Sequence, residues 1–248
     1  MRLGRLIRDP LLWVAAAFLV LMTQMSLLAP LFAWAFPAVQ PPIYASDSFA
    51  VLWLYHAALV AASSVAAIAV GIAGGVFATR PAGREFRPLI AALATIGQTF
   101  PPVAVLALAV PALGYGAAPT FVALTLYAIL PVLANTIAGL AGVPAAGREA
   151  ATAMGLTPLQ ILAQAELPLA APLILAGIRV SVIVNIGTAT IGSTVGAVTL
   201  GTPIIGGLIN DKTPYVIEGA ILVGLFAILT DLGFARLDRA LRRFAARD

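Results

Sequence analysis

Residues 88–147 of the chain read PLIAALATIGQTFPPVAVLALAVPALGYGAAPTFVALTLYAILPVLANTIAGLAGVPAAG. This stretch contains no Asp, Glu, Lys, Arg or His. A helix needs roughly 20 apolar residues to cross the hydrocarbon core of a bilayer, so this stretch has room for two crossings. Gly and Pro interrupt helices, and residues 114–119 (GYGAAP) therefore separate the two as a turn. The stretch predicts two membrane-spanning helices joined by a short loop.

The rest of the chain has the same apolar character. Of its 248 residues, 61% are hydrophobic and only 10% are charged, with a mean hydropathy of +1.04. A soluble domain typically has about 25% charged residues, so this composition excludes a soluble globular protein. The sequence predicts an all-α polytopic membrane protein with six transmembrane helices. The six stretches are approximately Leu11–Phe36, Trp53–Thr79, Pro88–Leu113, Pro119–Leu140, Pro172–Leu200 and Val216–Phe234.

The positions of the basic residues predict an orientation. Arginines cluster before the first stretch, between the second and third, between the fourth and fifth, and after the sixth, whereas Lys212 is the one basic residue in the alternate loops. Cytoplasmic loops carry an excess of Lys and Arg, so both termini are expected in the cytoplasm. The apolar run from Leu11 exceeds a signal-peptide core of about 7–15 residues, and we interpret it as a retained first helix.

Several chemistries are excluded by composition. The chain has no cysteine and a single histidine, His56, so a thiol nucleophile, a disulfide and a histidine metal site are not expected. A pI near 10 could indicate nucleic-acid binding, but the basic residues sit in short clusters between apolar stretches, as in membrane proteins. We expect no nucleic-acid partner.

The longest predicted cytoplasmic loop, residues 141–171, has helix signals of its own. One short helix is expected to start near Pro144 and stop at Gly155, because glycine suits a helix C-terminus. A second is expected to start at Thr157, with Pro158 in the first turn and a capping box completed three residues later, and to end at Pro168. The alternative interpretation is an amphipathic connector that rests on the membrane surface.

Glu149-Ala150-Ala151, Gly155 and Leu167-Pro168 in this loop resemble, in residue type and spacing, the signature of permeases of binding-protein-dependent ABC importers. The resemblance implies that the loop forms coupling helices that dock into a groove on a separate ATPase subunit. These six residues are the expected ATPase-coupling site, and ATP and Mg are expected on the partner, since this chain has no Gly-x-x-x-x-Gly-Lys-Ser/Thr loop. The chain is therefore not expected to be an enzyme by itself.

A wider resemblance covers about residues 50–235. Gln98-Thr99-Phe100-Pro101-Pro102 and Asn185-Ile-Gly-Thr188 are similar to segments of osmoprotectant permeases, whereas Ala197–Gly201 lacks a glycine that those permeases have. The implied organisation is an extra helix and outer loop in residues 1–50, a permease core of five helices in 51–235 and a basic cytoplasmic tail in 236–248. The implied partners are ATPase subunits, a second or sister permease, and a periplasmic or lipid-anchored substrate-binding protein. The implied location is the bacterial cytoplasmic (inner) membrane.

The implied function is transport of a small zwitterion or quaternary amine, such as glycine betaine, choline or carnitine. Gln98, Thr99, Pro101, Asn185 and Thr188 are the expected translocation path. The alternative for the polar residues is helix–helix packing, because hydroxyl and amide side chains join membrane helices. The functional alternatives are a permease for another small solute, such as an amino acid, and a secondary transporter or channel. A secondary transporter usually has ionisable groups at mid-membrane, which this sequence lacks.

Overall fold

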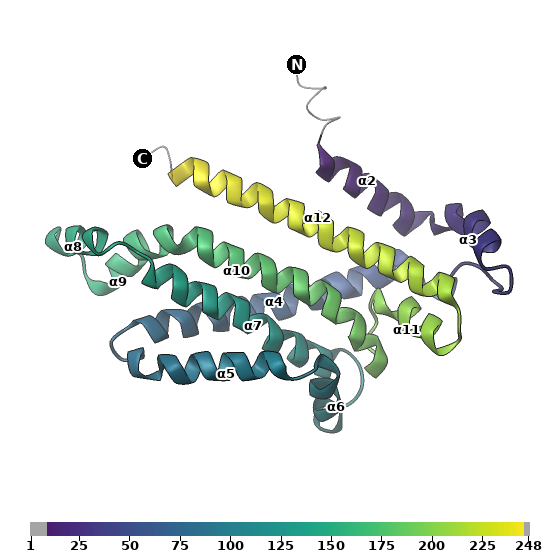
Figure 1. Cartoon of the computed structure of the whole chain (residues 1–248), viewed down its shortest axis with the longest axis horizontal. Helices are drawn as coiled ribbons and strands as arrows, with labels where there is room; N and C mark the ends of the chain where they lie inside the picture. Colours follow the sequence, from purple (N-terminus) through teal and green to yellow (C-terminus); the bar gives the residue numbers. More distant parts are fainter. Residues whose placement is uncertain (1–8, 246–248) are drawn as a thin grey trace, which may run out of the picture. The chain divides into compact units, whose positions relative to one another are not determined.

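The computed structural model describes residues 9–245, except for the side chains of residues 91, 94, 97, 98 and 241–245. The regular elements of this part of the chain are helices, which confirms the predicted all-α class (Figure 1). The α-helices are α2 (Pro10–Thr23), α3 (Ala29–Ala35), α4 (Phe49–Thr79), α5 (Arg87–Thr99), α6 (Pro102–Leu113), α7 (Ala117–Ala141), α8 (Ala145–Ala153), α9 (Pro158–Ile161), α10 (Leu167–Thr188), α11 (Gly201–Ile209) and α12 (Thr213–Ala245).

Within the described residues, four helices are long and apolar enough to cross a membrane. The count is five if the bent pair Pro10–Thr23 and Met25–Ala35 makes one crossing. The four are Phe49–Thr79, Ala117–Ala141, Pro158–Val195 and Thr213–Ala240. A count of six requires that α5 and α6 together make another crossing. The six-helix topology therefore stays a prediction, and the termini of the chain lie outside the described residues.

The first predicted span is a bent pair rather than one straight helix. Its two halves meet at 90°, beside Gln24, whose backbone is not helical (φ −132°, ψ 43°). The Thr23 hydroxyl donates to the Leu19 carbonyl at 2.8 Å, a bond back into the preceding turn that bends helices. The expectation of a continuous helix over Leu11–Phe36 was therefore wrong.

The third predicted span is also interrupted. A residue before proline avoids the helical region, and Phe100 accordingly has ψ 132° and ends α5, while Pro102 begins α6. A carbonyl freed in this way needs a new donor at membrane depth, and the Tyr127 hydroxyl donates to the Phe100 carbonyl. The two prolines thus divide the third predicted span into two helices, joined at a break where Tyr127 of α7 supplies the donor.

The fifth predicted span, Pro172–Leu200, has different boundaries in the structure. A helical run extends over Pro158–Val195, with a π-helical turn at Leu162–Glu166 and a 3-10 segment at Ala189–Val195. It ends at Gly196, which has the left-handed φ of +81°. The residues that follow form the separate short helix α11.

The chain divides into two compact units. Within the described residues, one comprises 9–62, 102–124 and 183–236, and the second comprises 63–101, 125–182 and 237–245. In the first unit, α2 lies beside α12 (Figure 1), and the Phe18 and Phe226 rings stack with centroids 6.1 Å apart. Phe18, Leu52, Leu200 and Leu222 belong to the buried apolar cluster of this unit.

His56 holds three segments of the first unit together. Its side chain is completely buried; Nε2 lies 3.1 Å from the Ile186 carbonyl and Nδ1 accepts from the Leu200 N–H at 3.3 Å. Because a carbonyl can only accept, Nε2 carries the proton and the imidazole is the neutral tautomer. The single histidine of the chain is therefore a bridge between backbones, and no group of three metal-ligating side chains occurs in residues 9–245.

The segment before α4 is attached to the start of α12. The buried Glu218 carboxylate accepts from the Tyr44 N–H at 3.1 Å, and the Tyr44 hydroxyl donates to Asp47 at 2.5 Å. Burial, and secondarily the Asp47 carboxylate, raises the pKa of the Tyr44 hydroxyl to about 12. The hydroxyl is thus a donor over the whole physiological range, and this loop is an ordered part of the first unit.

The second unit is built on close approach between helices. A Cβ added to Gly75 of α4 would lie 2.6 Å from the Thr136 Cβ of α7, and one added to Gly177 of α10 would lie 2.6 Å from the Asn135 Cβ. Small residues allow such approach in membranes, where apolar burial does not drive helices together. This packing places the ends of α4, α7 and α10 around the loop that contains α8 and α9.

Candidate functional site

The loop between α7 and α10 folds as the predicted pair of short helices. Helix α8 follows Pro144 and ends just before Gly155, whose φ of +79° is in the left-handed region. The N–H groups of Gly155 and Leu156 bond to the carbonyls of Thr152 (2.9 Å) and Ala151 (3.2 Å), which satisfies carbonyls at the helix end. Glycine is favoured at this turn because a side chain there strains the backbone.

The predicted capping box at the start of α9 is present. The Gln160 N–H donates to the Thr157 hydroxyl at 3.4 Å, and the Gln160 side-chain oxygen accepts from the Thr157 N–H at 2.8 Å. Pro158 occupies the first turn, where its missing N–H leaves no bond unmade. The local sequence thus defines both the turn and the direction of the second helix.

Pro168 does not end this helix, which corrects the expectation. Helix α9 continues through the π-helical turn Leu162–Glu166 into α10, and Pro168 lies in the first turn of α10. A proline in a regular α-helix clashes with the carbonyl four residues earlier, and a wider π-turn before it relieves this contact. The second loop helix and the following long helix are therefore one continuous helical rod.

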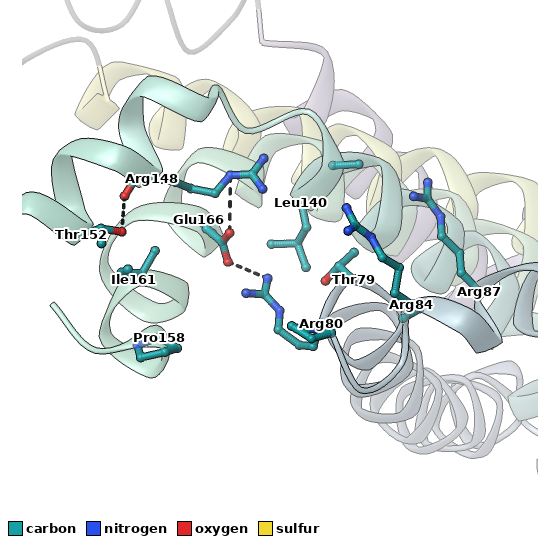
Figure 2. Close-up of a pocket in the computed structure, with 13 residues that line it drawn as sticks. Thr79, Arg80, Arg84, Arg87, Leu140, Arg148, Thr152, Pro158, Ile161 and Glu166 are labelled. Carbon is teal, nitrogen blue, oxygen red and sulfur yellow. Dashed lines mark hydrogen bonds and ion pairs between the residues drawn. The ribbon is translucent and has the colours of Figure 1, made fainter.

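A buried carboxylate links this rod to its neighbours. Glu166 accepts from the Arg80 guanidinium at 2.6 Å, and Arg148 Nε lies 3.7 Å from its other oxygen (Figure 2). The Glu166 side chain is only 4% exposed. Arg148 also donates to the Val143 carbonyl at 2.6 Å. One carboxylate thus ties together the end of α4, helix α8 and the start of α10.

The sequence analysis did not identify Glu166 or Arg80 as functional residues. The available signal was the isolation of Glu166, which is the one charged residue between Glu149 and Arg179. An unpaired buried charge is very costly, so a lone carboxylate in such a segment indicates a cationic partner. Which arginines approach it depends on chain packing, because Arg80 lies 86 positions away in sequence.

A pocket of about 580 Å³ opens beside this ion-pair cluster. Its lining comes from the end of α4 and the turn that follows, from the end of α7, and from the loop helices (Figure 2). The lining residues are Ala78, Thr79, Arg80, Pro81, Arg84, Arg87, Leu140, Ala141, Arg148, Thr152, Pro158, Ile161 and Glu166. The predicted loop and the predicted basic cluster after α4 therefore meet at one place.

The predicted coupling residues differ in exposure. Glu149, Ala150 and Gly155 are exposed, whereas Ala151 is buried. Leu167 is half-buried and Pro168 is exposed at the start of α10. The sequence analysis missed two large apolar side chains on the same loop, Met154 and Leu159, which are 72% and 74% exposed. Together with Gly155 they give the tip of the loop an apolar surface that the described part of this chain does not cover.

The predicted path residues of the second unit lie at the break between α5 and α6. Thr99 is exposed and donates to the Ile96 carbonyl at 2.7 Å, and Pro101 is exposed in the break itself. Gln98 belongs to the last turn of α5, and its side chain is outside the described part of the structure. The structure thus places this group at an irregular point of the backbone.

The predicted path residues of the first unit lie near the end of α10. Asn185 is completely buried, while Thr188 is half-buried and donates to the Val184 carbonyl at 2.9 Å within its own helix. On the same helix, Ser181 is buried and donates to the Ala128 carbonyl of α7 at 2.9 Å. That bond is a helix–helix contact, so the polar side chain of Ser181 serves packing.

The fold and the α8–α9 pair define a polytopic helical membrane protein with an ordered loop beside its spans. Residues 71–243 match the family of binding-protein-dependent transport system inner membrane components. The match includes α5–α11 and the whole of the α8–α9 loop. The chain belongs to this family of transport permeases.

Relatives with curated names agree with this assignment. The osmoprotectant import permease protein OsmY of Salmonella typhimurium is 41% identical over 186 residues, which cover 75% of this chain and 79% of the relative. The choline transport system permease protein OpuBB of Bacillus subtilis is 38% identical over 186 residues, covering 75% of this chain and 85% of the relative. The carnitine transport permease protein OpuCB of Listeria monocytogenes is 34% identical over 193 residues, covering 78% of this chain and 88% of the relative.

The fold is similar to that of a solved transporter. A chain from inward-facing structures of the MetNI methionine ABC transporter superposes with a TM-score of 0.68 at 24% sequence identity. The superposition covers 76% of this chain and 93% of the other. The all-α arrangement of this chain is therefore that of an ABC importer permease.

Proposed function

We propose that this chain forms the membrane path of an ATP-driven importer for a small zwitterion or quaternary amine, of the glycine betaine, choline or carnitine type. Its relatives named for osmoprotectants, choline and carnitine support the substrate class. ATP and Mg would be held by a separate ATPase subunit, and a binding protein would deliver the substrate. A second copy or a sister permease would complete the path.

The observation that carries the proposal is the α8–α9 pair. Its tip presents Met154, Gly155 and Leu159 to solvent, and an apolar, glycine-containing knob of this kind suits a groove on a partner protein. Glu149 is exposed on the same pair and can accept a charge-assisted hydrogen bond from the partner. We therefore assign ATPase coupling to Glu149, Ala150, Ala151, Gly155 and Leu167-Pro168.

Two structural connections can transmit motion from the tip of the α8–α9 loop to the membrane helices. The first is the continuous helical run from Pro158 into α10, and the second is the Glu166 cluster, which joins α8 to the end of α4. Separating these groups would leave the Glu166 carboxylate, which is only 4% exposed, without its cationic partners. A displacement of α8–α9 would thus move α4 and α10 together.

A substitution at Gly155 tests the docking role. A Cβ added at Gly155 meets nothing within 4 Å, so Gly155→Leu projects a side chain into the partner's space without a clash inside this chain. The left-handed backbone costs a leucine about 1–2 kcal/mol. Gly155→Asn is the matched control, because asparagine tolerates this conformation and is smaller.

We expect Gly155→Leu to abolish co-purification of the ATPase and uptake, while Gly155→Asn retains most of both. Each variant should insert into the membrane in normal amounts. Equal co-purification of the ATPase with Gly155→Leu and with the unchanged chain would contradict the docking role.

The substrate class has its own test. Cells with and without the system are compared for uptake of labelled glycine betaine, choline and carnitine at high osmolarity, and uptake of at least one is expected to depend on this chain. Uptake of an unrelated solute alone, such as an amino acid, would refute the substrate class and leave the permease assignment in place. Within the path we propose roles for Gln98, Thr99, Pro101, Asn185 and Thr188.

We also propose that both termini lie in the cytoplasm and that the protein resides in the inner membrane. The asymmetry between the arginine clusters and the single lysine supports this orientation. Reporter fusions at Ala82 and after Asp248 are expected to report the cytoplasm. A reporter signal from the outer side at either position would overturn the orientation.

A further inference from the structure

The pocket beside the loop helices has a strong excess of positive charge. Its lining includes four arginines, Arg80, Arg84, Arg87 and Arg148, and one carboxylate, Glu166, which gives a formal charge of +3 (four minus one). The C-terminal ends of α4 and α7 adjoin it, and each helix end contributes about half a negative charge. A net charge of roughly +2 remains, which favours an anionic ligand.

The four arginines are not equivalent. Arg80 and Arg148 are engaged by Glu166, and Arg148 also by the Val143 carbonyl. Arg84 and Arg87 are exposed, and within residues 9–245 neither side chain has an ion-pair partner. Both side chains line the pocket and are drawn in Figure 2. Two guanidinium groups that line one pocket can together bind a phosphate with paired hydrogen bonds.

The remainder of the lining is largely apolar. Ala78, Pro81, Leu140, Ala141 and Ile161 contribute to the wall. The pocket adjoins the ends of α4 and α7, two helices of spanning length. The end of a helix that crosses the hydrocarbon core is expected in the headgroup region. An inorganic phosphate would leave the apolar wall uncovered, whereas the glycerol end of a phospholipid would cover it.

We propose that this pocket binds the phosphodiester of an anionic phospholipid, with Arg84 and Arg87 on the phosphate and the apolar wall against the glycerol region. Basic pockets between membrane helices are suited to such headgroups. The bound lipid would lie against Thr152 and Pro158 of the loop helices, which also line the pocket. The lipid would thereby contact the helix pair assigned above to ATPase coupling.

The test uses the full-length chain purified in detergent. Short-chain phosphatidylglycerol is titrated and binding is followed by native mass spectrometry, with short-chain phosphatidylcholine and inorganic phosphate as separate arms. An exposed charge-assisted contact contributes up to about fivefold to affinity, so the double variant Arg84→Gln and Arg87→Gln should weaken phosphatidylglycerol binding about 30-fold. Both residues are exposed, so the double variant should remain folded.

The control is the double variant Arg236→Gln and Arg239→Gln, which removes two arginines of α12. This variant should bind phosphatidylglycerol within about twofold of the unchanged chain. Phosphatidylcholine and phosphate should bind much more weakly than phosphatidylglycerol. Equal weakening by both double variants would overturn the site, since it would show general surface attraction. Phosphate binding as tight as the lipid, or phosphatidylglycerol binding unchanged in the Arg84 and Arg87 variant, would overturn the lipid assignment.

Discussion

Replacing Glu166 by glutamine should loosen the α8–α9 loop while leaving the rest of the chain folded. The substitution keeps the size of the side chain and removes its charge. The 2.6 Å bond from Arg80 is a hydrogen bond between two charged groups, worth about 1.5–3 kcal/mol. Because the Arg80 side chain is 30% exposed, solvent screening places the bond near the lower end of that range.

The second partner adds little to this value. Arg148 Nε is 3.7 Å from the carboxylate and its side chain is 42% exposed, so its contribution is roughly 0.5 kcal/mol. The ion pairs thus stabilise the loop by about 2 kcal/mol. A glutamine amide oxygen can still accept from Arg80 and retains about 0.6 kcal/mol, which leaves a loss of about 1.4 kcal/mol, or tenfold in the opening equilibrium.

Hydrogen–deuterium exchange of the purified chain measures that equilibrium directly. Amides of α8 and α9 are expected to exchange about tenfold faster in Glu166→Gln, and amides in the centre of α7 at an unchanged rate. Glu85→Gln is the control, since it removes a negative charge from an exposed side chain that does not line the pocket and has no ion pair in the described part of the chain. Unchanged exchange of α8 and α9 in Glu166→Gln would refute the assignment of Glu166 as their anchor.

Three further outcomes follow from packing and hydrogen bonding. Gly75→Ala places a Cβ 2.6 Å from the Thr136 Cβ and should destabilise the chain by about 1–3 kcal/mol, measured as a lower midpoint of thermal unfolding in detergent. Gly233→Ala is the control, because its added Cβ meets nothing within 4 Å and should not lower that midpoint. His56→Leu leaves two buried backbone groups without their side-chain partner and should cost about 2–4 kcal/mol; an unchanged unfolding midpoint would contradict the bridging role. Thr157→Ala removes the hydroxyl of the capping box and should cost about 1 kcal/mol locally, so faster amide exchange confined to α9 is expected.

The elements that the sequence predicted well are those with local causes. Gly155 and the Thr157 capping box act within a few residues, and the structure has both where they were expected. The breaking of the third predicted span also has a local cause, the proline pair, but the sequence did not show that Tyr127 would supply the donor. A donor from another helix depends on how the helices pack.

The positions of the polar side chains were harder to predict. Ser181 and Asn185 are four residues apart and so share one face of α10, a position that suits either a path or a helix contact. Burial of both residues depends on which helices cover that face. Pro168 was wrongly predicted to end a helix. The rule that proline ends a helix does not take account of a π-turn before the proline, which lets the helix continue. The burial of the polar side chains thus depends on how helices meet, whereas the error at Pro168 arose within one helix.

The sequence by itself determined that this is an all-α membrane protein, because apolar length, charge position and capping residues act locally or against the bilayer. Only the tertiary structure decided that Glu166 is shared by Arg80 and Arg148, and that Arg84 and Arg87 border the same pocket as the loop helices. The physical reason is that an ion pair requires two side chains within about 4 Å, and residues 80 and 166 reach that distance through the packing of α4, α7 and α10.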